Sequence, residues 1–312
     1  MPTIYHKSVL LESAMDALAL HAGGTFCDAT LGDGGYSLCM LERLPEGGRV
    51  YGIDRDKEAL TRAQQRLLPF GERFQALQGN FGDIQQLLHQ IGIFQVNGIV
   101  CDLGVSTLQI SRPERGFMFS ATGPLDMRMS PEEGVTAAQV INTLSEKELA
   151  QIILQYGEER QAKRIAAAIV RERSRAPLST TSQLTEVVRR VVGERFVIKT
   201  LARVFQSFRI YVNNELGNLE KFLQQALELL VIGGRLVVVE YHSLESRLVK
   251  DFIRRQTHPC TCPTDLPFCV CGKKANVRII HQLIKPSEEE VAQNPRARSA
   301  RLRAVEKIGK DQ

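Results

Sequence analysis

The segment 28–54 most constrains the fold of this chain, because it contains the end of a strand, a glycine-rich turn, a helix and a second strand that ends in an acid. Apolar residues at 25–29 lead into the glycines, and because glycine has no Cβ the backbone there can come close to a ligand. Asp54 follows Gly34 by twenty positions, and in a βαβ unit this spacing lets the carboxylate accept hydrogen bonds from ribose hydroxyls. The segment therefore predicts a site for a nucleoside cofactor.

The glycine turn favours S-adenosylmethionine over a dinucleotide. Dinucleotide-binding turns read Gly-x-Gly-x-x-Gly and hold the pyrophosphate at the start of a helix. Residues 32–36 instead read Gly-Asp-Gly-Gly-Tyr. The carboxylate of Asp33 would repel a pyrophosphate, but it suits a cofactor that carries a sulfonium and an ammonium group. A turn that only connects a strand to a helix is the alternative interpretation, and the acid at Asp54 makes it the weaker one.

Apolar runs alternate with helical patterns at both ends of the chain, which is typical of an α/β fold with a mostly parallel sheet covered on both faces. We expect helices at 57–67 and 216–230, with the glycine pair at 233–234 ending the second. Strands are expected at 25–29, 49–54, 74–78, 98–103 and 235–241, with a last pair at 277–284 and 299–306.

The middle of the chain, from about residue 137 to 204, has only helical periodicity. An all-helical block between the fourth and fifth strands indicates an inserted subdomain. We therefore expect a discontinuous Rossmann-like core at 1–110 and 205–312 and an inserted helical substrate-recognition subdomain at 111–204. Its basic residues either dock a large anionic substrate or serve only solubility; they are Lys163, Arg164, Arg171, Arg173, Arg175, Arg189 and Arg190.

Charge and hydropathy indicate a cytoplasmic protein. No run approaches the roughly 18 apolar residues of a membrane-spanning helix. Glu12 and Asp16 interrupt the N-terminal stretch, so neither a membrane span nor a signal peptide is expected. The net charge of +5 over 312 residues permits a polyanionic partner without requiring one. Oligomeric state does not follow from the sequence.

Ligands of open α/β sheets bind beyond the carboxyl ends of the strands, so the strand ends hold the candidate site residues. Phe81, which follows the third expected strand, could pack on an adenine ring. The polar and aromatic residues at or after the other strand ends are Asp54, Asp102, Gln109, Tyr241, His242 and Ser243.

Further motifs follow one another from the N-terminus to about residue 303, at 6–12, 28–37, 102–106, 115–117, 123–129, 156–160, 209–216, 242–245 and 294–299. Two of them read Asp102-Leu103-Gly104-Val105-Ser106 and His242-Ser243-Leu244-Glu245. Together they resemble the ribosomal RNA small subunit methyltransferase H family, bacterial enzymes that methylate the N4 atom of a cytosine in 16S rRNA. Because the motifs are many and in order, this resemblance is far more specific than a glycine turn.

The resemblance implies an S-adenosylmethionine-dependent methyltransferase with a Rossmann-like core and an inserted helical domain. It implies that the substrate is a cytidine in the decoding region of 16S rRNA, presented within a nearly assembled small ribosomal subunit. Tyr36 stands where the family commonly has histidine; tyrosine keeps a ring and a donor, so we expect the contact to survive with an altered pH response. The implied cofactor contacts are Gly34, Gly35, Tyr36, Asp54, Phe81, Asp102 and Gln109.

Asp102 is the candidate catalytic residue. The lone pair of a cytosine amino group is delocalised into the ring, so an oxygen acceptor must hold its N–H groups while the nitrogen pyramidalises toward the methyl group. Many amino-methyltransferases carry Asp/Asn-Pro-Pro-aromatic at the fourth strand, whereas this chain has Asp102 followed by Leu-Gly-Val. Asp102 is thus either this acceptor or a cofactor ligand, and His242 either faces the base or is a structural residue.

Two other functions are compatible with parts of the pattern. A methyltransferase acting on DNA or on a small molecule would turn over those substrates without ribosomal subunits. An RNA-binding assembly factor that keeps the cofactor fold as a scaffold would bind subunits without methyl transfer, whether or not Asp54 is replaced. The scaffold interpretation is the weaker one, because all five strand ends carry polar or aromatic residues.

The seven cysteines fall into two groups. Disulfides are not expected in a cytosolic protein, and the isolated Cys27, Cys39 and Cys101 are expected in the core. The other four lie within twelve positions and are compatible with a tetrahedral zinc site, a redox-sensitive loop or plain surface thiols; they are Cys260, Cys262, Cys269 and Cys271. Because Cys-x-Cys spacing is tighter than is usual for zinc, we assign no metal ligands from the sequence.

Overall fold

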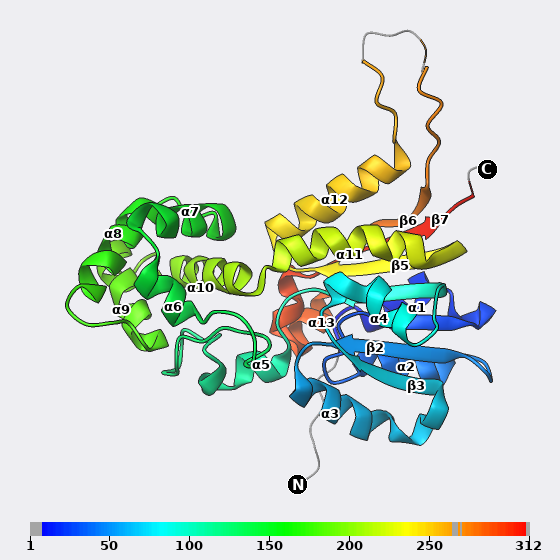
Figure 1. The fold of residues 1–312 in the computed structure, drawn as a ribbon, viewed down its shortest axis with the longest axis horizontal. Helices are drawn as coiled ribbons and strands as arrows, with labels where there is room; N and C mark the ends of the chain where they lie inside the picture. Colours follow the sequence, from blue (N-terminus) through cyan, green and yellow to red (C-terminus); the bar gives the residue numbers. More distant parts are fainter. Residues whose placement is uncertain (1–7, 264–267, 269, 310–312) are drawn as a thin grey trace. The chain divides into compact units, whose positions relative to one another are not determined.

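The computed structural model describes residues 8–263, 268 and 270–309, and the chain divides into two compact units (Figure 1). One unit holds the residues up to Gly104 together with those from Leu216 onward, and the other is Val105–Glu215. These boundaries lie outside the expected 111–204. The expected end at 204 would cut helix α10 (Val197–Asn213), which belongs wholly to the inserted unit because Val204, Phe205 and Phe208 lie in that unit's core.

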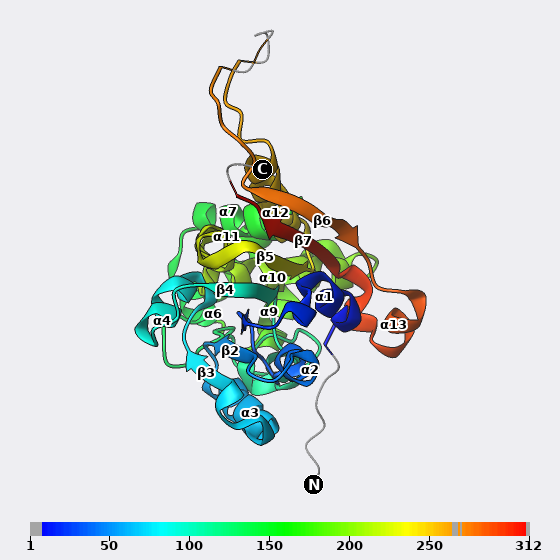
Figure 2. The same cartoon turned by 90° about the vertical axis from the view of Figure 1, so that its right-hand side faces the viewer.

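The first unit is built on a seven-stranded sheet in the order β3-β2-β1-β4-β5-β7-β6 (Figure 2). Neighbouring strands are parallel except β7, which is antiparallel to both β5 and β6. All seven expected strands are confirmed. They are β1 (Thr25–Asp28), β2 (Arg49–Asp54), β3 (Phe74–Gln78), β4 (Val96–Asp102), β5 (Leu230–Glu240), β6 (Val277–Ile284) and β7 (Arg301–Lys307).

Helices cover both faces of this sheet. Successive side chains of a strand point to opposite faces, and accordingly Phe26 packs in one apolar cluster with α1 and α2 while Cys27 packs in another with α4, α11 and α12. The expected helices at 57–67 and 216–230 are confirmed as α3 and α11. The helices of this unit are α1 (Leu11–Leu18), α2 (Gly35–Arg43), α3 (Lys57–Leu67), α4 (Ile84–Gln90), α11 (Glu215–Leu229), α12 (Ser243–Thr257) and α13 (Glu288–Gln293).

The inserted unit is helical, as the periodicity predicts. Its helices are α5 (Thr107–Ser111), α6 (Ala137–Thr143), α7 (Glu146–Gly157), α8 (Ala162–Arg173), α9 (Thr181–Val192) and α10. Thr136, Ser145 and Thr180 begin three of these helices with capping boxes, in which the hydroxyl and the third helical residue satisfy each other's backbone N–H groups. The apolar faces of the helices enclose a core of their own.

Two further expectations are tested by the fold. Within the part of the chain that the structure describes, no helix has the combined length and apolarity that a bilayer crossing requires. Cys27, Cys39 and Cys101 are buried, which confirms them as core residues.

Candidate active site

The turn after β1 is closely packed at two glycines and open at a third. A Cβ on Gly35 would lie 2.1 Å from Ser8 Oγ, and one on Gly34 would lie 3.1 Å from Leu67 Cδ1 at a φ of +74°. A Cβ on Gly32, where φ is +49°, would meet nothing nearer than the Thr30 carbonyl oxygen at 4.0 Å. The turn is therefore held tightly from inside, while its backbone at Gly32 can be approached by a ligand.

Asp33 in this turn is paired within the protein. Its carboxylate lies 2.8 Å from Arg62 Nε and 3.2 Å from Arg62 Nη2, and Arg66 donates to its carbonyl oxygen at 3.0 Å. The positive charge of Arg62 offsets the negative charge of Asp33. The expectation that Asp33 repels a pyrophosphate is weakened by this ion pair. The negative charge of the site must therefore come from other carboxylates.

Asp54 lies directly beneath the glycine turn, as the βαβ spacing predicts. Its Oδ2 accepts a hydrogen bond from the Gly32 N–H at 2.8 Å, and its Oδ1 accepts one from the Asp56 N–H at 2.9 Å. Burial raises the pKa of Asp54 to about 6, while these backbone donors act in the opposite direction. The end of β2 and the turn after β1 thus form one rigid group.

Asp102 joins the ends of three adjacent strands. The Tyr241 hydroxyl, just after β5, donates to Asp102 Oδ1 at 2.7 Å, and the Asp102 N–H donates to Thr30 Oγ1, just after β1, at 2.6 Å. Burial raises the pKa of Asp102 to about 7, with smaller upward contributions from Asp28 and Glu245 and a downward one from the Tyr241 hydrogen bond. This carboxyl group therefore titrates near neutral pH.

Asp28 is a third carboxylate of the site, and it lies where the sequence predicts that the first strand runs into the glycine turn. It is fully buried, it accepts a hydrogen bond from the Ser37 hydroxyl at 2.8 Å, and burial raises its pKa to about 6. Carboxylates with raised pKa values concentrate at functional sites. Because a nearby cation favours their ionised form, Asp28, Asp54 and Asp102 suit a ligand that carries positive charge.

The other predicted cofactor contacts lie in different surroundings. Tyr36 is 3 % exposed and its hydroxyl donates to the Val9 carbonyl oxygen, so that hydroxyl is engaged within the protein. Phe81 follows β3 at the start of the short helix η3 (Phe81–Asp83) and packs edge-on against Phe222, with ring centroids 5.4 Å apart.

Gln109 belongs to the inserted unit. It is buried at the third position of α5, where its side chain accepts from the Ser106 N–H at 3.1 Å and its own N–H donates to Ser106 Oγ at 3.2 Å. The structure therefore assigns Gln109 a capping role, and its contact with the cofactor stays a prediction.

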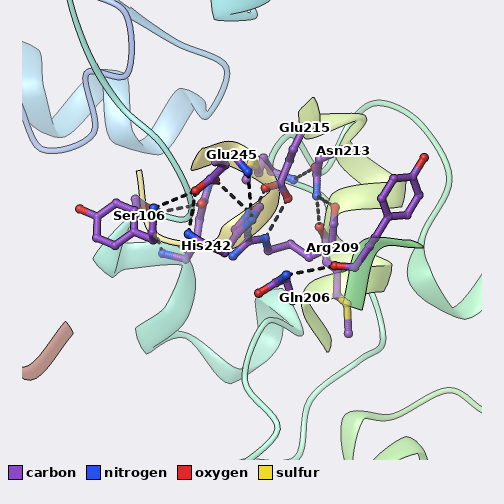
Figure 3. Close-up of polar contacts among 12 residues, drawn as sticks. Ser106, Gln206, Arg209, Asn213, Glu215, His242 and Glu245 are labelled. Atoms are coloured by element: carbon purple, nitrogen blue, oxygen red, sulfur yellow. Dashed lines mark hydrogen bonds and ion pairs between the residues drawn. The ribbon is translucent and has the colours of Figure 1, made fainter. Parts of the chain in front are cut away.

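His242 caps helix α12. Its Nδ1 accepts from the Glu245 N–H at 3.4 Å, and its Nε2 lies 3.0 Å from the carboxylate of Glu245 (Figure 3). Glu245 also accepts from the backbone N–H groups of Tyr241 and His242, at 2.8 and 3.2 Å. These contacts support the structural interpretation of His242. Its partner Glu245 in turn holds the backbone of Tyr241, whose hydroxyl donates to Asp102.

Asn213 is a residue whose role the sequence analysis missed. Its amide nitrogen donates to the Met127 carbonyl oxygen at 2.7 Å and its oxygen accepts from the Met129 N–H at 2.8 Å, which fixes the buried loop in which Met127 has a φ of +61°. Nearby, Arg209 forms two hydrogen bonds with Glu215, both at 2.8 Å (Figure 3). The sequence contained a signal for this group, because the motif 209–216 includes Arg209, Asn213 and Glu215.

The strand order, the single antiparallel strand β7, the glycine turn and the acid at the end of β2 define a Rossmann-like S-adenosylmethionine-dependent methyltransferase. Residues 3–308 match the MraW methylase family. The chain belongs to this family.

Relatives in the family cover nearly the whole chain. The ribosomal RNA small subunit methyltransferase H of Carboxydothermus hydrogenoformans is 48% identical over 306 residues, covering 97% of this chain and 98% of that protein. The protein of the same name from Thermomicrobium roseum is 47% identical over 308 residues, covering 98% and 94% of the two chains. The solved structure of an rRNA methylase from Streptococcus thermophilus is a distant neighbour, with 13% identity, a TM-score of 0.43, and coverage of 98% of this chain and 100% of that one.

Proposed function

We propose that the protein transfers a methyl group from S-adenosylmethionine to the N4 amino group of a cytidine in the decoding region of 16S rRNA, within the small ribosomal subunit. The observation that carries the proposal is the half-buried carboxylate of Asp102, which accepts a hydrogen bond from the Tyr241 hydroxyl at 2.7 Å in a chain of the MraW methylase family. The names of its relatives support rRNA as the class of substrate.

The residues present fit the cofactor. Asp54, which accepts a hydrogen bond from the Gly32 N–H, would also accept hydrogen bonds from the ribose. The backbone at Gly32 is open, so the ligand would lie against it. Phe81 would pack on the adenine ring, while the carboxylate of Asp28 would favour the cationic end. When bound, S-adenosylmethionine supplies an electrophilic methyl group.

Asp102 would prepare the nucleophile. Its ionised carboxylate would accept a hydrogen bond from the cytosine amino group and thereby favour the pyramidal nitrogen whose lone pair attacks. The Tyr241 hydroxyl would hold the carboxylate in one orientation and favour its ionised form. The proton released from the amino group would move toward Asp102 as the N–C bond forms.

The inserted unit would contact RNA phosphates through part of its basic cluster. Arg189 and Arg190 are paired with acids, since Arg189 lies 3.2 Å from Glu194 and Arg190 lies 3.0 Å from Glu186. Arg173 donates to the carbonyl oxygens of Ile141 and Leu144 and is structural. The exposed Lys163, Arg164 and Arg171 all lie on α8, and we assign them to phosphate binding.

The test is methyl transfer from labelled S-adenosylmethionine to unmodified small subunits, with mass analysis of the nucleosides. Free rRNA and duplex DNA run alongside, and Asp54→Ala serves as the cofactor-site variant. N4-methylcytidine from subunits, with cofactor affinity and product both lost in the variant, would support the proposal. Labelled DNA, or cofactor binding without any labelled rRNA, would refute it in favour of another target or of the scaffold.

A further inference from the structure

The connection between α12 and β6 lies apart from the strand ends that form the candidate active site. We call residues 258–276 the cysteine arm. Its described residues contain no helix or strand, and they extend away from the sheet of their own unit (Figures 1 and 2). Asn276 closes its base, because its backbone N–H donates to the Gln256 carbonyl oxygen at 2.8 Å and its amide donates to Gln256 Oε1 at 2.7 Å.

Hydrophobic burial does not order the described part of the cysteine arm. Phe268 and Val270, its large apolar residues, are 79% and 77% exposed. If side chains of this segment are held together, the stability must come from a source other than apolar burial. A metal ion that joins distant parts of a loop is one such source.

The side chains brought together are thiols. The Sγ atoms of Cys260, Cys262 and Cys271 all lie within 4.8 Å of one another, and those of Cys260 and Cys271 are 3.8 Å apart. A disulfide would need about 2.05 Å. Four sulfurs placed tetrahedrally at about 2.3 Å from a zinc ion are separated by about 3.8 Å. The separation of 3.8 Å between Cys260 Sγ and Cys271 Sγ is therefore compatible with two ligands of one zinc ion.

A backbone donor faces one of the three thiols. The Val270 N–H lies 3.3 Å from Cys262 Sγ and points toward it. Hydrogen bonds of this kind orient metal ligands and stabilise their charge. The exposed Lys273 and Lys274, which follow Cys271 in the chain, offset the negative charge that several thiolates on one zinc ion would carry.

We propose that Cys260, Cys262 and Cys271 bind a structural zinc ion that holds the cysteine arm in shape. The donors are all thiolates, as in closed structural sites rather than catalytic ones. Cys269, the fourth cysteine of the group that the sequence analysis names, lies outside the described residues. The site is independent of the proposed methyl transfer and uses no residue assigned to it.

The test measures metal bound to the full chain, expressed without a polyhistidine tag and purified under reducing conditions. We expect about one zinc per chain by elemental mass spectrometry, and at least a fivefold loss in the triple variant Cys260→Ser, Cys262→Ser, Cys271→Ser. Cys39→Ala is the matched control, since Cys39 is a buried thiol on α2, and it should retain the zinc. Cobalt added in place of zinc should give the intense visible absorption of tetrahedral thiolate coordination in the parent chain and not in the triple variant.

Circular dichroism and thermal unfolding show whether the triple variant is folded, and we expect no change because the substituted residues lie outside the core. Unchanged zinc content in a folded triple variant would overturn the proposal. So would a reduced, metal-free parent chain that takes up neither zinc nor cobalt, or a chain that carries iron and sulfide in place of zinc.

Discussion

At the scale of single residues, the raised pKa of Asp102 predicts how methyl transfer depends on pH. Burial raises this pKa from 3.8 to about 7, and the acceptor is the ionised form. The kcat/KM for S-adenosylmethionine should therefore rise with pH through about 7 and level off above it, because this ratio reports groups of the enzyme before the cofactor binds. Asp102→Asn should lower kcat/KM about a hundredfold or more and remove this rise.

Tyr241→Phe is the matched variant for this prediction. It keeps the ring but removes the hydroxyl that donates to Asp102 and lowers the pKa of that carboxyl group. The rise of kcat/KM should then move to higher pH while the plateau is largely retained. A profile that is unchanged in both variants would show that Asp102 is not the titrating acceptor, and cofactor affinity measured by calorimetry would show whether it is a cofactor ligand instead.

The residues that sequence reasoning located are those whose position follows from the topology. Asp54 and Asp102 end parallel strands, so their place at one edge of the sheet could be predicted before any contact was known. The partners of Asp33 and Tyr36 could not, because Arg62 and Val9 reach them through packing between segments distant in the chain. Side-chain pairing of this kind leaves no periodic signal in the sequence.

At the scale of elements, the basic side chains on one face of α8 predict how kcat/KM for subunits depends on salt concentration. Replacing Lys163, Arg164 and Arg171 with alanine should lower kcat/KM for subunits about tenfold at physiological salt. The slope of log kcat/KM against log salt concentration should become shallower by about two, since each phosphate contact contributes roughly 0.7–0.9.

Arg189 and Arg190 provide the control, because these arginines are exposed on α9 but paired with acids. Their replacement should change the slope much less, and neither variant should alter the affinity for S-adenosylmethionine. Equal slopes for the parent chain and the α8 variant would exclude this helix as the phosphate-binding surface.

Elements with strong periodicity were predicted well, and their ends less so. The glycine pair at 233–234 was expected to precede the fifth strand, but β5 already begins at Leu230, because residues 231–234 fall in an irregularity between two paired stretches. The regular ladder resumes at Arg235, where the strand was expected. The start of β5 is thus set by its pairing with β4. The apolar pattern of the sequence carries no information about this pairing.

At the scale of the whole molecule, Gln109 tests whether the inserted unit takes part in cofactor binding. Gln109 belongs to the unit Val105–Glu215, whereas Asp54 and Asp102 belong to the sheet unit. If Gln109 contacts the cofactor, Gln109→Ala should weaken binding about fivefold, the value of one hydrogen bond of about 1 kcal/mol. It should also reduce the rise in Tm that a fixed excess of S-adenosylmethionine produces in the full chain, because a ligand stabilises the folded state by a free energy that grows with the logarithm of its affinity.

Gln139→Ala separates this effect from the loss of a helix cap. Gln139 occupies the third position of α6 and closes a capping box with Thr136, as Gln109 does with Ser106 in α5. Both variants should lose some stability without ligand, because both remove a cap, but only Gln109→Ala should change the dissociation constant measured by calorimetry. If the two variants bind S-adenosylmethionine equally well, Gln109 is not a cofactor contact, and its side chain serves only to cap α5.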